Sequence, residues 1–276
     1  INEDSGFAYV VGSNEAAGGL YIIDLSNPAS PTFAGSFASD GYTHDVQVVN
    51  YAGPDTVHVG QEIAFAANED TLTIVDVTDK GPPAGNPVQL SRTGYANSQY
   101  THQGWLSEDH RYYYFNDELD ERNLGNNTRT HVFDVSDLDS PVYVGFHEHN
   151  SQAIDHNLYV HDGYIFEANY ESGVRILKAT NPGQAQMVES GFIDTHAGDS
   201  AAFNGAWSVY PFFDDGKFLV SDIQNGLIIA QFDEPSSFVN DNKLNGFTLS
   251  GQQDLTDDEN TRVAVFAQIF ADFAAP

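Results

Sequence analysis

The sequence contains no cysteine and few basic residues. Its 276 residues include 40 acidic but only 10 basic side chains, which gives a formal net charge of −30 with the histidines neutral. The absence of cysteine excludes disulfides, a thiol nucleophile, a Cys-ligated zinc and a Cys-bound iron–sulfur cluster. The excess negative charge repels phosphate backbones and anionic lipid surfaces, so we expect no nucleic-acid partner.

Long apolar runs and familiar catalytic fingerprints are also missing. No stretch of 18 apolar residues is present, so we expect no membrane span. Neither a serine-nucleophile motif nor a phosphate-binding glycine loop nor a dinucleotide fingerprint occurs. The 41% apolar and 13% aromatic residues are enough for a sizeable core. An acidic, lysine-poor surface stays hydrated in salty surroundings, which indicates an extracellular or cell-surface protein of a marine or halophilic bacterium.

Helical periodicity is nearly absent, and short β-rich runs recur instead. One run of apolar residues followed by a polar turn occupies residues 20–25, 72–77, 130–135, 174–179 and 227–232. A second recurring element opens with Thr43-His44-Asp45, Thr101-His102-Gln103, Asp155-His156-Asn157 and, in altered form, Asn204-Gly205-Ala206. Further strands fit between them, at 62–67, 112–116, 164–169 and 218–222, and at 32–37, 87–94, 142–147 and 187–193. Four strands in each period of about 50 residues predict an all-β propeller, because a sandwich or jelly roll lacks such a period.

The repeat register predicts where the propeller begins and ends in this chain. Residues 3–6 align with 108–111, the turn after an innermost strand, so we expect residues 1–232 to form a propeller that starts inside a blade. Either about five blades close on themselves, or one to two N-terminal blades come from the same precursor or from another chain. Residues 233–276 contain an acidic loop and then apolar residues at helical spacing, which favours a short C-terminal helix packed on the propeller; a terminal strand is the alternative.

Several of these strings resemble the choice-of-anchor B family of bacterial surface and secreted proteins with LVIVD-type repeats. The resemblance spans residues 1 to about 232, and the strings that carry it are Asp40-Gly-Tyr-Thr-His44-Asp45, Tyr100-Thr-His102-Gln103-Gly-Trp105, Ala153-Ile-Asp155-His156-Asn157 and Phe203-Asn204-Gly-Ala-Trp207. It implies a propeller that extends further towards the N-terminus and a location outside the cytoplasm. It implies no particular activity.

Three histidines at one register of the repeat are the strongest candidates for a site. His44, His102 and His156 lie at intervals of 58 (44 to 102) and 54 (102 to 156) residues, each at the start of an innermost strand. They should therefore ring one mouth of the central axis, where neutral imidazoles suit Zn, Cu, Fe or Ni. The alternative is that each histidine hydrogen-bonds the neighbouring blade.

Polar and aromatic residues accompany this predicted ring. Asp45, Gln103 and Asn157 follow the histidines and could orient metal ligands or bind a substrate. In the fourth copy Asn204-Gly205 takes the equivalent place, which would leave the ring open on that side, and Trp207 follows at a place related to that of Trp105. Trp207 could stack on a sugar or pack between blades.

An acidic run follows the second strand of the His102 blade. It comprises Asp117, Glu118, Asp120 and Glu121, whose oxygens suit Ca²⁺. Glu118 could also act as a general acid or base, and Tyr170, near His156, could abstract a proton. The alternatives are a solvated acidic loop and, for Tyr170, a packed blade residue.

Three functions remain open at this point. The first is a surface module that binds a metal ion, an extracellular polymer or a surface protein at the axial mouth. The second is a metal-dependent secreted oxidase, hydrolase or lyase that uses the three histidines. The third is a scaffold in a surface assembly. A fold of this class hosts all three, so the site must decide between them.

Overall fold

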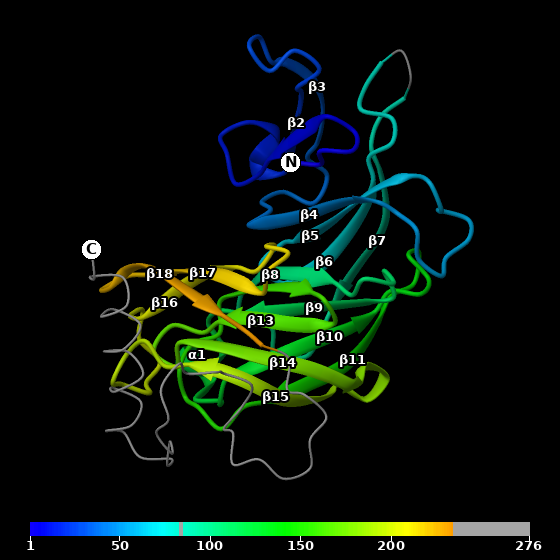
Figure 1. Ribbon diagram of the computed structural model, residues 1–276. Helices are drawn as coiled ribbons and strands as arrows, with labels where there is room; N and C mark the ends of the chain where they lie inside the picture. The colour runs from blue at the N-terminus through cyan, green and yellow to red at the C-terminus, as the bar shows by residue number, and fades with distance from the viewer. Residues whose placement is uncertain (83–84, 234–276) are drawn as a thin grey trace.

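The computed structural model describes residues 1–82 and 85–233, which form five antiparallel sheets (Figure 1). The first sheet comprises β1 (Phe7–Val10), β2 (Leu20–Asp24) and β3 (Thr32–Phe37). The second comprises β4 (Asp45–Asn50), β5 (Glu62–Ala67), β6 (Thr71–Asp76) and β7 (Val88–Gly94). The third comprises β8 (Thr101–Leu106), β9 (Tyr112–Asp117), β10 (Arg129–Asp134) and β11 (Val142–Glu148).

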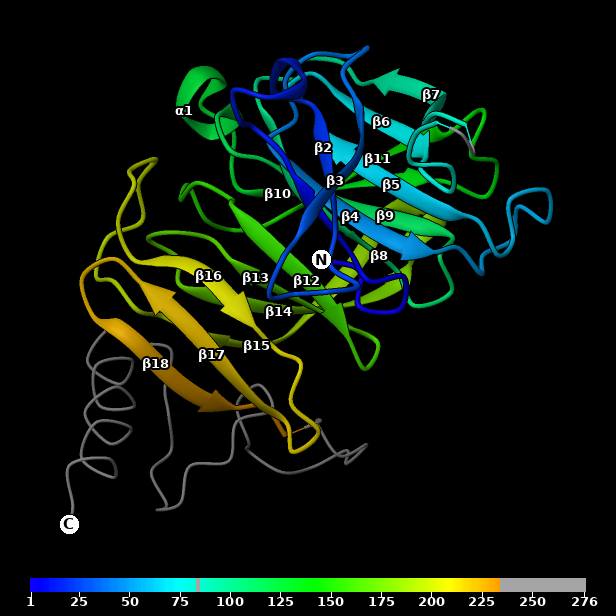
Figure 2. The ribbon, with the colours of Figure 1, turned by 90° about the horizontal axis from the view of Figure 1, so that it is seen from above.

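The last two sheets continue the series. The fourth comprises β12 (Asn157–His161), β13 (Tyr164–Ala168), β14 (Val174–Asn181) and β15 (Gln186–Ile193). The fifth comprises β16 (Ala206–Tyr210), β17 (Lys217–Asp222) and β18 (Gly226–Gln231). Within every sheet, strands that follow one another in the chain are hydrogen-bonded neighbours. The first strands β4, β8, β12 and β16 contact one another from sheet to sheet (Figure 2). The predicted all-β propeller is therefore confirmed, with five blades.

The first and last blades have three strands each. The recurring run 20–25 forms β2, which pairs with β1 and β3, so this blade holds the equivalents of the second to fourth strands of a complete blade. The alignment of residues 3–6 with a turn after an innermost strand stays a prediction. The fifth blade holds the equivalents of the first three strands.

Four apolar layers lie between the five blades. In the second blade Ile63 and Phe65 pack against the third blade, whereas Ala64 and Val75 pack against the first. Similar layers join the third blade to the fourth and the fourth to the fifth. Successive side chains of a strand point to opposite faces, and both faces of a middle blade are covered. This is why β5 and β6 are almost entirely buried and why β5 is apolar after its first residue.

The aspartates that end the recurring third strands shape the turn that follows. Asp24, Asp76 and Asp134 each accept a hydrogen bond through Oδ1 from the backbone N–H two residues on, at 2.7–2.9 Å. Such a turn competes with the sheet ladder and ends the strand. A register shift also recurs at one place between the third and fourth strands of the first four blades.

Helical structure is confined to short segments in the part of the chain that the structure describes. Two 3-10 turns cover Ala16–Gly18 and Pro182–Gln184, and α1 covers Asp120–Leu124, within the acidic run that the sequence placed in a loop. Among these residues, none of the helices is long and apolar enough to span a membrane. The C-terminal acidic loop and helix expected within 233–276 lie, from residue 234 on, outside the described residues.

Candidate functional site

The three repeated histidines lie in a row at one end of the innermost strands. His102 is in the middle, with its ring centroid 4.1 Å from that of His44 and 4.3 Å from that of His156. His44 and His156 directly precede β4 and β12, and His102 is the second residue of β8. The repeat thus delivers one imidazole from each of the second, third and fourth blades to the same mouth.

Two of these histidines hydrogen-bond the next blade through one ring nitrogen. Nδ1 of His102 lies 3.1 Å from the carbonyl oxygen of His156, and Nδ1 of His156 bonds the carbonyl oxygen of Trp207. A carbonyl oxygen can only accept, so Nδ1 carries the hydrogen in both rings and Nε2 of the neutral ring carries a lone pair. The inter-blade bond and an available Nε2 therefore coexist, although the sequence presented them as alternatives.

Glu118 faces both Nε2 atoms. Its Oε1 lies 3.4 Å from Nε2 of His156, and its Oε2 lies 3.7 Å from Nε2 of His102. The hydroxyl of Tyr170 donates to Oε1 at 2.8 Å and orients the carboxylate. Ligand atoms of His102, Glu118 and His156 all lie within 4.8 Å of one another. We call these three residues the axial group.

The axial histidines are held in the neutral form. Burial, together with the neighbouring imidazoles of His156 and His44, lowers the pKa of His102 to about 2. Burial likewise lowers the pKa of His156 to about 4, against the effect of its bond to Trp207. Burial raises the pKa of Glu118, opposed by the bond from Tyr170. Two lone pairs therefore face a carboxylate, an arrangement that needs a proton or a cation between them.

His44 has a different environment from the other two histidines. Its Nδ1 lies 3.1 Å from the hydroxyl of Tyr42 and 3.0 Å from that of Tyr100. Burial lowers its pKa as well. His44 therefore stands beside the axial group, and Glu118 takes the third position that the sequence suggested for a histidine.

The repeat explains why Glu118 reaches the axis. Strand pairing matches the residue after each histidine with Ala67, Asn116 and Ala168. Two residues beyond these partners stand Glu69, Glu118 and Tyr170. Glu118 and Tyr170 thus occupy one repeat position, at the end of second strands, and both point to the same mouth. Alignment of the second strands, and not only of the histidine strands, would have identified this position.

The amides next to the histidines join the blades. Gln103 donates to the carbonyl oxygen of Leu158 at 2.9 Å and accepts from its N–H at 2.8 Å. Asn157 donates to the carbonyl oxygen of Trp207 at 3.0 Å, and Gln47, which the sequence did not single out, accepts from the N–H of Leu106. These side chains hold adjacent inner strands in register, which gives Gln103 and Asn157 a structural role.

The other predicted residues lie around the same end of the blades. Burial raises the pKa of Asp45 to about 6, and its carboxylate accepts from the N–H of Val46. Asn204 bonds Glu171 and Gln224. Trp207 is 50% exposed, with its ring centroid 5.7 Å from that of His156.

Tyr42, Phe203 and Trp207 form an aromatic rim beside the axial group. Tyr42 and Phe203 are 38% and 40% exposed. Tyr42 lies next to His44, and the ring centroid of Phe203 is 5.3 Å from that of Tyr170. Exposed rings around a polar centre can hold the apolar face of a ligand.

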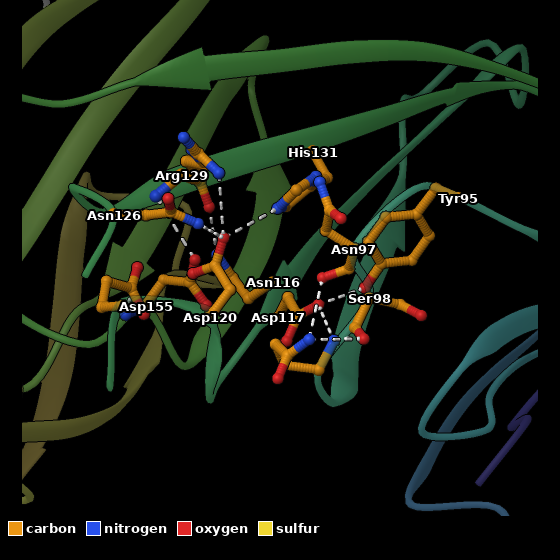
Figure 3. A network of polar contacts seen from close by, with 12 residues as sticks. Tyr95, Asn97, Ser98, Asn116, Asp117, Asp120, Asn126, Arg129, His131 and Asp155 are labelled. Atoms are coloured by element: carbon orange, nitrogen blue, oxygen red, sulfur yellow. Dashed lines mark hydrogen bonds and ion pairs between the residues drawn. The ribbon is translucent and has the colours of Figure 1, made fainter. Parts of the chain in front are cut away.

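The acidic run is not a solvated loop. Asp117, Asp120 and Glu121 are buried, so that alternative is wrong for these three residues. Asp117 accepts hydrogen bonds from the hydroxyl of Tyr95 and from the N–H groups of Gln99 and Tyr100 at 2.6–2.7 Å (Figure 3). It thereby positions the segment that carries Tyr100 to His44.

These features define a propeller with LVIVD-type repeats and a polar centre at one mouth of its axis. The LVIVD-repeat family model matches residues 5–39, which contain β1, β2 and β3. No curated protein matches the sequence significantly.

Solved structures share the fold at low sequence identity. The periplasmic gluconolactonase PpgL of Pseudomonas aeruginosa is 14% identical, with a TM-score of 0.57 over 81% of this chain and 62% of that chain. The dihydro-heme d1 dehydrogenase NirN in complex with DHE is 16% identical, with a TM-score of 0.51 over 92% of this chain and 46% of that one. This chain therefore spans less than two thirds of either protein, and the likeness shows the fold alone.

Proposed function

We propose that this chain is an extracytoplasmic propeller that binds one divalent transition-metal ion through His102, Glu118 and His156. The observation that carries the proposal is the pair of lone-pair-bearing Nε2 atoms that face one carboxylate. Carbonyl oxygens that accept from Nδ1 fix the tautomer and ring orientation, as they commonly do for metal-binding histidines. Membership of the choice-of-anchor B family, and hence a cell-surface location, is part of the proposal, and the periplasmic gluconolactonase of the same fold is consistent with it.

The distances fit a zinc-sized ion. Bonds of 2.0–2.1 Å in a tetrahedral site separate the ligand atoms by about 3.3–3.4 Å. The carboxylate oxygens of Glu118 lie 3.4 and 3.7 Å from the two Nε2 atoms. Two nitrogen donors and one oxygen donor favour Zn, Cu, Fe or Ni over a hard ion such as Ca²⁺.

The ligand of this metal module is expected on the aromatic rim. Tyr42, Phe203 and Trp207 offer ring faces around the axial group, which suits an extracellular polymer with apolar sugar faces. A surface protein is the other partner to test. Binding of oligosaccharides to the metal-loaded chain, compared with Trp207→Ala, measures this part of the proposal.

The decisive experiment measures metal content and the affinity for Zn²⁺, with a histidine outside the axial group as the control. Elemental analysis of protein purified without chelators should find about one transition-metal ion per chain. His102→Ala should lower the affinity for Zn²⁺ more than about 100-fold, because the loss of even an outer partner costs 10–100-fold. His161→Ala, at the opposite end of β12 from His156, should leave it unchanged. A wild-type chain that neither carries nor takes up Zn²⁺ contradicts the proposal and leaves a proton in the axial group, as a scaffold would allow.

An enzyme is the second candidate, favoured by the ligand count. Catalytic zinc sites use three protein ligands and keep a position for water or substrate. The axial group offers three, and the side chain of Glu118 is still 15% exposed. Because a gluconolactonase shares the fold, lactones and simple esters are sensible first substrates. Hydrolysis that depends on the added metal and is lost in His102→Ala would support an enzyme; its absence over a broad panel would favour the binding module.

A further inference from the structure

Three carboxylates meet in the interior close to the axial group. Asp120 and Glu121 come from α1 and Asp155 from the connection that leads into β12, and their exposed fractions are 2%, 3% and 0%. One oxygen from each lies within 4.8 Å of the others. We call these residues the carboxylate cluster; Figure 3 shows Asp120 and Asp155 side by side.

Asp120 Oδ2 accepts from the side chain of Asn126 at 3.0 Å, but one oxygen of each carboxylate in the cluster lacks a donor in the part of the chain that the structure describes. Asp120 Oδ1, Glu121 Oε2 and Asp155 Oδ1 have no hydrogen-bond partner among the described residues. The bonds to the second oxygens of Glu121 and Asp155, from the N–H groups of Asp155 and Arg129, are long at 3.4 and 3.3 Å. A buried carboxylate oxygen without a donor is costly, so three of them together point to a missing positive partner.

The nearest cation does not supply enough charge. The guanidinium of Arg129 lies 3.4 Å from Asp120 Oδ2 and also pairs with Glu148 at the surface. Three carboxylates therefore share part of one positive charge. Burial and the charge of Asp120 raise the pKa of Glu121 to about 9.

A histidine, His131, also lies against the carboxylate cluster. His131 is 4% exposed, and its Nε2 lies 3.9 Å from Asp120 Oδ2 without a hydrogen-bond partner within the described part of the chain. Its Nδ1 is bonded to the hydroxyl of Tyr143 at 2.8 Å. The neighbouring Asp120 Oδ2 is already contacted by Asn126 and Arg129 (Figure 3). The buried His131 Nε2, without a hydrogen-bond partner among the described residues, is therefore a second sign of an absent ligand, independent of the carboxylate oxygens.

We propose that Asp120, Glu121 and Asp155 bind a hard divalent cation, with Ca²⁺ as the best match. Ca²⁺ prefers oxygen ligands at 2.3–2.6 Å, which places oxygens on opposite sides about 4.6–5.2 Å apart and neighbouring ones closer. The separations within the cluster, up to 4.8 Å, fit that geometry. The two positive charges of the ion would add to the part of the Arg129 charge that reaches the cluster and offset most of the charge of three carboxylates.

The site has a mechanical consequence for the mouth of the propeller. It ties α1 of the third blade to the segment that enters the fourth blade, because Glu121 accepts from the N–H of Asp155. Glu118 precedes Asp120 by two residues, and His156 follows Asp155 directly. Bound Ca²⁺ would therefore hold two members of the axial group in place; this consequence, unlike the site itself, rests on the proposed function.

Calcium titration of the full chain tests the site. After chelation and dialysis, CaCl₂ alone should raise the melting temperature by about 5–10 °C at concentrations a hundredfold above Kd, with one Ca²⁺ per chain by equilibrium dialysis. MgCl₂ should act more weakly, because Mg²⁺ demands stricter geometry. Glu121→Gln should lose the shift, and in chelator it should melt at or above the wild type, because the amide can donate to the neighbouring oxygens.

Controls separate this site from the axial group. Glu3→Gln removes an exposed carboxylate and should keep the full calcium response, as should His102→Ala. Asp155→Asn repeats the test should Glu121→Gln fail to fold. No bound calcium in the wild type, or an unchanged response in a folded Glu121→Gln or Asp155→Asn variant, overturns the proposal. A calcium response that persists while Zn²⁺ binding proves absent overturns the proposed function instead.

Discussion

The axial group and the carboxylate cluster are neighbours in the chain and differ in chemistry. Glu118 stands two residues from Asp120, and His156 directly follows Asp155. Two segments therefore supply the whole cluster and two of the three axial residues, while His102 comes from β8. The axial group has neutral nitrogens and an oriented carboxylate beside an exposed rim, whereas the cluster has only oxygens and is sealed from solvent. A change of direction over one or two residues thus separates a group of two nitrogens and one carboxylate beside the rim from a group of buried oxygens alone.

Glu62, by contrast, is a buried carboxylate that has hydrogen-bond donors and a cation supplied by neighbouring side chains. It accepts hydrogen bonds from Asn2 at 2.8 Å and Ser5 at 2.6 Å, and it forms an ion pair with Lys80. Burial acts to raise the pKa of Glu62, but the bonds from Lys80 and Ser5 outweigh this effect and hold the pKa below its ordinary value. In the carboxylate cluster the side chains of Arg129 and Asn126 reach only Asp120 Oδ2, and one oxygen of each of the three carboxylates has no donor among the described residues, so we expect the cluster and not Glu62 to respond to calcium.

The largest expected effect separates the structural role of Gln103 from the metal-binding role proposed for its neighbour in β8, His102. Gln103→Leu should lower the free energy of unfolding by about 3 kcal/mol, because it leaves the N–H and carbonyl of Leu158 buried and unpaired. Urea denaturation measures this change. The Zn²⁺ affinity of the folded variant should stay within about threefold of the wild type. A stable Gln103→Leu variant that loses the metal would make Gln103 part of the site rather than a link between blades.

A smaller effect on the affinity for Zn²⁺ is expected at Tyr170, which orients the carboxylate of Glu118. Tyr170→Phe removes the donor to Glu118 Oε1, and the affinity for Zn²⁺ should fall about 10-fold, the lower end of the cost of losing an outer partner. The melting-temperature shift caused by calcium should not change. Tyr9→Phe, in the first blade, is the matched control. An equal loss of both responses would mean that the two groups act as one unit.

The smallest expected effect is the pH dependence of the stability that Glu62 contributes. Because the folded pKa of Glu62 is depressed, its stabilisation is present above the unfolded value of about 4.3 and is lost as the pH falls through the folded value. Glu62→Gln should therefore be about 1 kcal/mol less stable than the wild type at pH 7, with the gap closing below about pH 4. Thermal melts in chelator across this range measure it. A gap that depends on calcium instead would place Glu62 with the cluster.

Much of the fold could be predicted from the sequence, because the spacing between copies of a repeat shows which residues occupy equivalent strand positions. The strand predicted at 32–37 is β3 and that at 62–67 is β5, residue for residue, and the polar turns follow the predicted aspartates. Alignment of His44, His102 and His156 also located the mouth correctly as their common end of the inner strands. α1 was missed because it has only five residues, too few for a periodic pattern.

The sequence alone determined the blade architecture, the residues of the inner strands and the kinds of donor at the mouth, because these follow from local periodicity and repeat spacing. Only the tertiary structure decided that Glu118 faces His102 and His156, that Gln103 joins blades, and that Asp155 lies with Asp120 and Glu121. Those relations join residues about 15 to 55 positions apart. They depend on how one blade packs on the next, which no pattern within a single repeat encodes.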